Sequence, residues 1–410
     1  VTVRHDWAIS GPFSSQNDKQ EDPISQDGQK EAMEHAGRTG GLPFVGVGWY
    51  RTEFDVPQFQ AGKRATILFD GAMSHANVYI NGQKVGYWPY GYNSFHFDIT
   101  KYLKPGQKNT LAVRLENQPE SSRWYPGAGL YRNVHLIVTE DAYIPVWGTY
   151  ITTPSVNEKF AKVNVRAKVV LPEGADPARY SVETSLWNPD KQKLTAVRTS
   201  LAQMKYDNDQ VEQDFIIQDP SLWSPEMPAL YSAETRLYEG DKLKDIYTTP
   251  FGIRSIEIIP DKGFFLNGKQ TVFKGVCNHH DLGPLGVAVN DAAIRRQIRI
   301  LKDMGCNAIR TSHNMPAPEL IRACDEMGMM IMAESFDEWN VAKCRNGYNL
   351  LFDEWAEKDL MNLLHNFRNN PSVVMWCVAN EVPNQWNEGD CKIAKWLQDI
   401  CHREDPTRPV

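Results

Sequence analysis

Residues 368–381 read Arg-Asn-Asn-Pro-Ser-Val-Val-Met-Trp-Cys-Val-Ala-Asn-Glu, and this stretch decides how the second half of the chain folds. A polar break that contains Pro371 precedes an uncharged run over 373–378, and the run is followed by Asn380-Glu381. Short apolar runs that are rich in β-branched residues and bounded by turn residues are typical of strands buried on both faces. The stretch therefore predicts a buried strand with a carboxylate just beyond its end.

Helical patterns lie on both sides of this strand, at 354–367 and 390–401. A helix–strand–helix order predicts a parallel strand, because parallel neighbours need a crossover connection. Barrel folds of this kind place their chemistry where a strand meets the loop to the next helix. Glu381 occupies that position, although an isolated glutamate there would be interpreted as a solvated residue or a helix cap.

Strands and helices alternate in the same way upstream of this unit. Ile294, Ile298 and Leu301 have the spacing of one helical face. Strands are predicted at 271–277, 306–311 and 329–334, and a further helix at 318–327. With residues 373–378 these make four β–α steps, the order of the first half of a (β/α)8 TIM barrel. An open half-barrel would expose a parallel edge strand, so we expect residues 255–410 to be the N-terminal half of a longer domain.

Residues 1–139 contain short alternating runs separated by turns, and helical patterns are absent. An Asn81-Gly82 pair within 76–86 is typical of a hairpin turn, because both residues adopt positive φ readily. Further strands are predicted at 48–54, 65–69, 110–116 and 133–138. These signals predict a β-sandwich.

Residues 140–254 also contain short strands and no cysteine. The clearest runs are 162–171, 182–187 and 230–238. An immunoglobulin-like β-sandwich without its disulfide fits this pattern, and we interpret the segment as a spacer. A second hairpin turn, at Asn267-Gly268, then opens the α/β part of the chain.

Composition excludes several classes of protein. A chain of 410 residues predicts two or three domains. The net charge of −7 and the lack of a basic block give no support to nucleic-acid binding, and no apolar run reaches the roughly 18 residues of a membrane span. All seven cysteines lie between Cys277 and Cys401 without Cys-x-x-Cys spacing, which indicates free buried thiols instead of disulfides or zinc. The compartment stays open, and a homo-oligomer is compatible with this composition.

Two stretches of the α/β part carry recognisable patterns. Residues 367–376 with Asn380-Glu381 form one, and residues 307–329 contain the other, Asn-Ala-Ile-Arg-Thr-Ser-His and later Cys-Asp-Glu-Met-Gly-Met. Together they resemble the signatures of glycoside hydrolase family 2, which contains β-galactosidases, β-glucuronidases and β-mannosidases. Residues 49–51, 91–93 and 127–132 resemble the sugar-binding jelly roll of that family. The match departs at Asn370, Cys377 and Asn314-Met315, none of which removes a catalytic group.

The resemblance implies a retaining glycosidase, which cleaves the glycosidic bond with two carboxyl groups about 5–5.5 Å apart. Glu381 matches the acid/base of the family, and the nucleophile is expected beyond Val410, at the end of the seventh strand. Asn380 matches the residue that binds the sugar 2-hydroxyl, although a capping role is the alternative. The substrate would be an oligosaccharide or another glycoside.

Further polar residues are predicted to meet Glu381 at one mouth, because the carboxyl ends of parallel strands lie together. His279 follows the first strand, and His313 follows the second. The resemblance implies that both histidines contact the sugar, and a structural role is the alternative for each. For Arg310, an ion pair at the strand end and a ligand contact are equally favoured. Arg123-Trp124 belong to a jelly-roll loop that reaches the barrel mouth in the family, so both are predicted to bind substrate.

The loop after the third strand bears on metal binding. In some family members a carboxylate like Glu338 shares magnesium with a histidine two residues on, but Asn340 stands at that position. We therefore predict no metal site and no cofactor. Trp339 and Trp386 are candidates for stacking on a sugar, with buried packing as the alternative.

The leading hypothesis is a retaining exo-β-glycosidase, with β-galactosidase ahead of β-glucuronidase and β-mannosidase. Well-known members carry aspartate at the Arg123 position, which weakens any direct transfer of sugar identity. A carbohydrate-binding relative without turnover is a second class, and a glutamate ending the seventh strand would exclude it. A purely structural array of sandwiches is a third class, which Asn380-Glu381 argue against.

Overall fold

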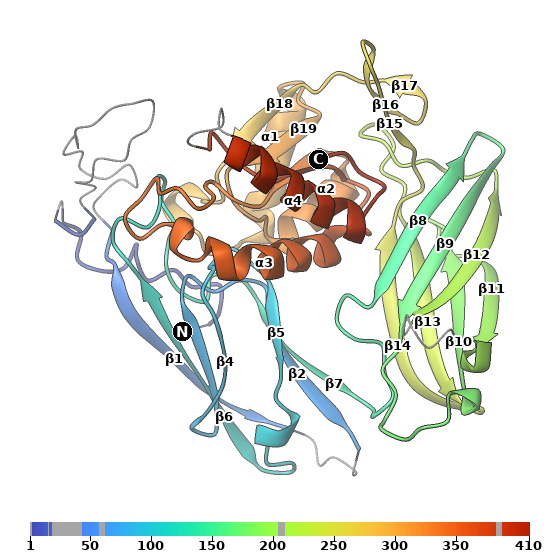
Figure 1. Ribbon diagram of the computed structural model, residues 1–410, viewed down its shortest axis with the longest axis horizontal. Coiled ribbons are helices and arrows are strands. Elements are labelled where there is room, and N and C mark those ends of the chain that lie inside the picture. The colour runs from blue at the N-terminus through green and yellow to red at the C-terminus, as the bar shows by residue number, and fades with distance from the viewer. Residues whose placement is uncertain (1, 15, 19–42, 57–61, 204–209, 383–387) are drawn as a thin grey trace.

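The computed structural model describes residues 2–14, 16–18, 43–56, 62–203, 210–382 and 388–410. Two β-sandwiches and an α/β part make up this region, as predicted (Figure 1). No helix among the described residues is long and apolar enough to cross a membrane.

The first sandwich is a jelly roll of two antiparallel sheets. One sheet has the order β1 (Gly46–Asp55), β6 (Lys108–Asn117), β3 (Ala76–Ile80) and β4 (Gln83–Trp88). The other has the order β5 (Phe95–Asp98), β2 (Arg64–Phe69) and β7 (Val134–Thr139). Asn81 (φ 51°) and Gly82 (φ 82°) form the predicted β3–β4 turn. Strand β5 was not predicted, because its four residues are too few to show an alternating pattern.

The second sandwich is immunoglobulin-like. Its sheets are β11 (Lys193–Ser200), β10 (Tyr180–Trp187), β13 (Tyr231–Glu239) and β14 (Lys242–Phe251), and β12 (Gln210–Gln218), β9 (Phe160–Lys168) and β8 (Thr149–Val156). A small antiparallel sheet follows, with β15 (Ile256–Ile259), β16 (Gly263–Leu266) and β17 (Lys269–Gln270). Asn267 and Gly268, both with positive φ, form its predicted turn. The cysteines of the described residues form no disulfide, as predicted, but the prediction that they are buried is wrong for Cys277 and Cys391, which are exposed.

The α/β part contains the four predicted β–α steps. In chain order they are β18 (Gly275–Asn278), α1 (Asp291–Asp303), β19 (Ala308–Thr311), α2 (Pro318–Met327), β20 (Met330–Glu334), α3 (Phe352–Phe367), β21 (Val373–Cys377) and α4 (Glu388–Glu404). The strands pair in parallel in the order β18-β19-β20-β21. Helix α1 begins after Asn290, which accepts a hydrogen bond from the Ala293 amide, and it buries the predicted Ile294, Ile298 and Leu301. The order is that of half a TIM barrel.

The two sandwiches contact opposite ends of this sheet. The immunoglobulin-like sandwich lies at the amino end of β21, where Arg254 donates to the carbonyls of Pro371 and Val373. The jelly roll lies at the carboxyl ends, where Arg132 donates to the carbonyls of Met315 and Pro316 after β19. The end that the jelly roll covers is the end at which barrel enzymes carry out chemistry.

Candidate active site

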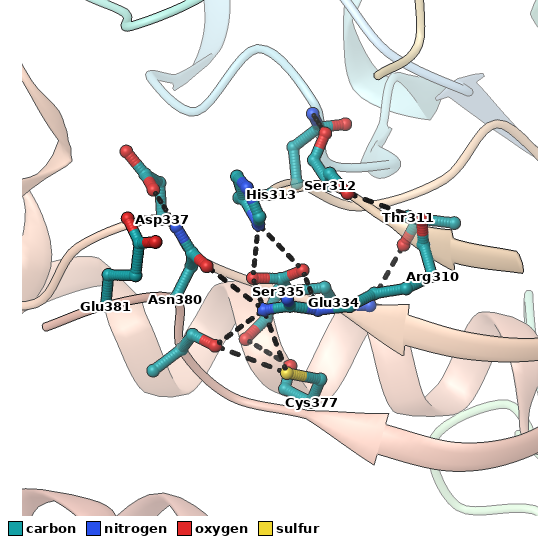
Figure 2. Close-up of polar contacts among 12 residues, drawn as sticks. Arg310, Thr311, Ser312, His313, Glu334, Ser335, Asp337, Cys377, Asn380 and Glu381 are labelled. Carbon is teal, nitrogen blue, oxygen red and sulfur yellow. Dashed lines mark hydrogen bonds and ion pairs between the residues drawn. The ribbon is translucent and has the colours of Figure 1, made fainter. Parts of the chain in front are cut away.

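Polar side chains from successive strands meet at the carboxyl end of the parallel sheet. Arg310 and Glu334 lie within β19 and β20, His313 follows β19, and Asn380 and Glu381 follow β21 (Figure 2). The predicted convergence at one mouth is therefore present in the structure. The chain folds this way because the strands are parallel and adjacent, so their ends lie side by side.

Glu334 is the buried centre of this group. Its carboxylate lies between His313, whose Nδ1 is 3.1 Å from both oxygens, and Arg310, whose Nε is 2.9 Å from Oε2 (Figure 2). Burial raises the pKa of Glu334, whereas His313 and Arg310 counteract that rise. Of the two roles predicted for Arg310, these contacts favour the ion pair at the strand end.

The Asn380 side chain is held in one orientation. Its Nδ2 donates to Asp337 Oδ1 at 3.0 Å, and its Oδ1 accepts from Arg310 Nη2 at 3.2 Å. A carboxylate can only accept hydrogen bonds and a guanidinium can only donate them, so these two partners determine the positions of the Asn380 Nδ2 and Oδ1 atoms. The side chain carries a second Nδ2 proton beyond the one donated to Asp337.

Glu381 differs from its neighbours because it is exposed. Its side chain is 64% exposed, and its backbone has a positive φ of 39°, which turns the chain sharply after β21. Arg123 Nη1 from the jelly roll lies 3.6 Å from Glu381 Oε2. The carboxylate therefore stands at the surface of the mouth beside a cation of another part of the chain.

The jelly-roll loop that carries Arg123 and Trp124 forms a wall of the mouth. The Trp124 ring stacks on His279 with centroids 4.9 Å apart and meets His313 edge-on at 5.8 Å. His279 Nδ1 lies 2.8 Å from the Ser312 carbonyl and must donate to it, which leaves Nε2 as an acceptor in the neutral ring. Burial lowers the pKa of His279, which favours that neutral ring.

Two important residues of the mouth were not predicted from the sequence. Asp337 follows β20 and binds Arg123 through both carboxylate oxygens, at 2.8 and 2.6 Å. Lys343 is fully buried, and its Nζ donates to the Asp337 carbonyl and to the Asn380 carbonyl. The signal that could have found Asp337 is its position, since it follows a parallel strand as Glu381 does. The burial of Lys343 has no sequence signal, because a lysine in an irregular loop is normally solvated.

Other candidates have structural contacts. His280 is buried with Nε2 3.1 Å from the Pro126 carbonyl, and burial lowers its pKa to about 3. Glu338 accepts from the backbone amides of Lys343 and Asn349, and burial raises its pKa to about 7. Trp339 is buried and donates to the Val378 carbonyl, so it packs instead of presenting a face to a sugar. Trp386 lies outside the described residues.

A separate cavity of about 830 Å³ lies away from this mouth, between the edge strands β1 and β7 of the jelly roll. Its lining includes core side chains from both sheets, such as Ile67, Val113 and Leu130. A sugar presents hydroxyl groups over most of its surface, so this apolar lining suits it less well than the polar mouth.

Comparison with known proteins places this geometry in a family. Models of the sugar-binding domain, of a central domain and of the TIM barrel domain of glycosyl hydrolase family 2 match residues 6–140, 143–254 and 257–410. The three matches follow one another along almost the whole chain. The chain belongs to glycoside hydrolase family 2.

Several relatives of this family 2 chain are known. A β-galactosidase, BoGH2A from Bacteroides ovatus, is 44% identical over 95% of the chain, and a putative β-glucuronidase from Formosa agariphila is 36% identical over 93%. A solved family 2 structure from Bacteroides cellulosilyticus superposes over the whole chain with a TM-score of 0.89 at 32% identity. The chain spans 44%, 34% and 51% of the lengths of these three proteins.

The carboxylates around the mouth of this family 2 chain are not chemically equivalent. Glu334 is paired with Arg310 and His313, Asp337 is paired with Arg123, and Glu338 accepts backbone amides. Among these four carboxylates, Glu381 is the most exposed to solvent, with 64% of its side chain exposed against 12% for Asp337.

Proposed function

We propose that the whole protein is a retaining exo-β-glycosidase, with Glu381 as its general acid and base and a β-galactoside as its substrate. The observation that carries the proposal is the pair Asn380-Glu381 at the carboxyl end of β21, with the Glu381 carboxylate exposed at the mouth. In a double displacement the acid protonates the leaving oxygen, and in the second step it takes a proton from water. The second carboxyl group of the family belongs to the seventh strand, and the described residues form the first four strands of the barrel.

The remaining residues would hold the sugar. Asn380 would donate its second Nδ2 proton to the 2-hydroxyl, a bond that strengthens in the transition state. The acceptor Nε2 of His279 would bind a sugar hydroxyl, and the buried Trp124 ring would support His279 by stacking on it, with His313 next to both. Arg310 would act indirectly, by holding Asn380 and Glu334.

The choice of a neutral sugar rests on the charges of the mouth. Arg310 pairs with Glu334, and Arg123 and Lys343 share Asp337, so each of these cations already contacts a carboxylate of the protein. A uronic acid would require a cation that is available to its carboxylate. This supports a β-galactoside, in agreement with the activity named for the Bacteroides ovatus relative.

A β-glucuronide is the second candidate substrate, because relatives from Formosa agariphila and Bacteroides fragilis carry that name at 36% and 31% identity. The two candidates are separated by kcat/KM for 4-nitrophenyl β-galactoside, β-glucuronide and β-mannoside. We expect the β-galactoside to be the best of the three. A preference for the glucuronide would reject the neutral sugar and leave the role of Glu381 intact.

Glu381→Ala in the whole protein tests the acid/base role. Protonation matters most for a poor leaving group, so we expect a loss of roughly 10²- to 10⁴-fold in kcat/KM on a disaccharide. A dinitrophenyl glycoside needs almost no protonation and should lose far less. Glu354→Ala on α3 is the matched control, because that side chain is similarly exposed at 72% and lies outside the mouth. Equal losses on both substrates would contradict the assignment.

A further inference from the structure

The contacts of Arg123 suggest a role other than sugar binding. Its Nε and Nη2 donate to the two oxygens of Asp337, which is the bidentate geometry of a strong guanidinium–carboxylate pair. Both side chains are largely buried, with 15% and 12% exposed. The pair joins the jelly-roll loop to the loop after β20, so it fixes the guanidinium relative to the barrel.

The partner of Arg123 is itself held firmly. Asp337 Oδ1 also accepts from Asn380 Nδ2 at 3.0 Å and from the buried Lys343 Nζ at 3.2 Å. Burial would raise the pKa of Asp337, but the contacts with Arg123, Lys343 and Asn380 lower it below its ordinary value. Asp337 is therefore an ionised, immobile anchor.

The one terminal nitrogen of Arg123 that Asp337 does not bind is Nη1, and it lies 3.6 Å from Glu381 Oε2. Lys343 holds the loop from the other side, because its Nζ donates to the carbonyl of Asn380, the residue before Glu381. The side chain of Glu381 is thus placed by the jelly roll, and its backbone is placed by the barrel loop.

We propose that Arg123 is a positioning residue for Glu381: anchored by Asp337, it uses Nη1 to hold the Glu381 carboxylate over the bond that is cleaved. This rests on the proposed acid/base role of Glu381. The jelly roll then takes part in the proton-transfer step, whereas the sequence predicted that Arg123 binds substrate. A misplaced acid loses proton transfer most where the leaving group needs it.

Dependence on the leaving group separates the two roles. A residue that binds the sugar contacts the same sugar in every substrate of a series, so its loss lowers kcat/KM equally for all of them. Loss of a residue that positions the acid lowers kcat/KM only slightly for a dinitrophenyl glycoside and strongly for a phenyl glycoside. Loss of a residue that only stabilises the fold lowers the denaturation midpoint and leaves the ratio of phenyl to dinitrophenyl activity unchanged.

The test compares Arg123→Gln, Arg123→Lys and wild type of the whole protein on phenyl, nitrophenyl and dinitrophenyl glycosides of one sugar. We expect Arg123→Gln to lose roughly 10- to 100-fold on the phenyl glycoside, less than the acid itself contributes, and only a few-fold on the dinitrophenyl glycoside. Arg123→Lys should recover part of the loss. Equal losses across the series would overturn the proposal.

Arg123→Gln leaves Asp337 without its main partner and could fail to fold, so Arg123→Gln/Asp337→Asn is the second variant. It removes the charge of Asp337 that Arg123→Gln leaves without its main partner, while Lys343 keeps the carbonyls of Asp337 and Asn380 as acceptors. We expect the same leaving-group dependence from this variant. An unchanged ratio of phenyl to dinitrophenyl activity in it would equally overturn the proposal.

Glu381→Ala measured on the same series keeps the two proposals distinguishable. If the loss of kcat/KM in Glu381→Ala depends strongly on the leaving group and the loss in the Arg123 variants does not, only the positioning role fails. If Glu381→Ala itself shows no such dependence, the acid/base role fails. Because Arg123 acts through Glu381, adding Arg123→Gln to Glu381→Ala should change the phenyl-to-dinitrophenyl ratio no further.

Discussion

The two β-sandwiches contact the same half-barrel and contribute differently to it. The immunoglobulin-like sandwich binds the amino end of β21, where the Asn369 side chain accepts from the Ile151 amide and donates to the Thr149 carbonyl of β8. The jelly roll binds the carboxyl ends, where Arg123 and Trp124 enter the mouth. In the first contact a side chain binds backbone groups, whereas the second contact places side chains beside candidate chemistry.

The residues before and after β21 show the same difference between the two ends of the sheet. Asn369 binds the immunoglobulin-like sandwich, and Asn370 binds the buried carboxylate of Asp325. Asn380 and Glu381 lie at the other end of the strand, in the mouth. Residues that adjoin in one sequence motif therefore serve structure at one end of the strand and the candidate chemistry at the other.

The jelly roll also has a purely structural contact, and the ionisation of the carboxyl group in this contact should have the largest effect on stability. Asp359 of α3 accepts from Trp88, Asn93 and Tyr348, and burial raises its pKa to about 7. A carboxyl group whose pKa is raised on folding stabilises the fold fully at pH values below its pKa in the unfolded chain. This contribution to the free energy of unfolding is lost as the pH rises through the folded-state pKa of about 7. The loss is about 4 kcal/mol at most.

Asp359→Asn stays neutral and should therefore equal wild type near pH 4 and be more stable by up to about 4 kcal/mol near pH 8. Urea denaturation across this pH range measures the difference. Asp353→Asn, at an exposed position on the same helix, is the matched control and should show no such trend. Parallel stability curves for Asp359→Asn and wild type would contradict the prediction.

At the opposite end of the sheet, Asn369→Ala should lower stability without touching the chemistry. It leaves the buried amide of Ile151 and the buried carbonyl of Thr149 without their partner, at about 1–3 kcal/mol for each group. The urea midpoint should fall, while the ratio of phenyl to dinitrophenyl activity stays at the wild-type value. A changed ratio would show that this end also positions the acid.

Substitution of one tryptophan in each sandwich should have the smallest effect and compares the two sandwiches most directly. Trp124 of the jelly roll donates Nε1 to the Tyr92 hydroxyl, and Trp223 of the immunoglobulin-like sandwich donates Nε1 to the Asp325 carbonyl. Replacement by Phe removes each donor and should cost about 1–3 kcal/mol of stability in both. Only Trp124→Phe should also lower kcat/KM, by about tenfold and equally for every leaving group, because the stacking surface shrinks. Identical kinetics for the two variants would remove Trp124 from the sugar site.

Much of the fold could be predicted because its signals are local. Strand β21, the face of α1 and the turns at Asn81-Gly82 and Asn267-Gly268 depend on neighbouring residues alone. The convergence of His313 with Glu381 also followed, because parallel strands bring their ends together.

The residues that hold the loops of the mouth in place were not predicted from the sequence. Asp337 and Lys343 lie in an irregular loop, and their roles depend on Arg123, which is more than 200 positions away. The resemblance assigned Arg123 to the substrate because the jelly-roll loop that carries it reaches the barrel mouth in the family. Pairing between distant loops has no period and no local signature, so only the structure reveals it.

The most direct measurement of the central claim is the product that Glu381→Ala forms from a dinitrophenyl β-glycoside in the presence of azide. Without its base the variant should be slow in the second step, and azide needs no base to attack the glycosyl-enzyme. We predict that azide restores turnover and that the product is the β-glycosyl azide, with retained configuration. If azide restores nothing, or if the product is the α-glycosyl azide expected after loss of the nucleophile, Glu381 is not the acid/base.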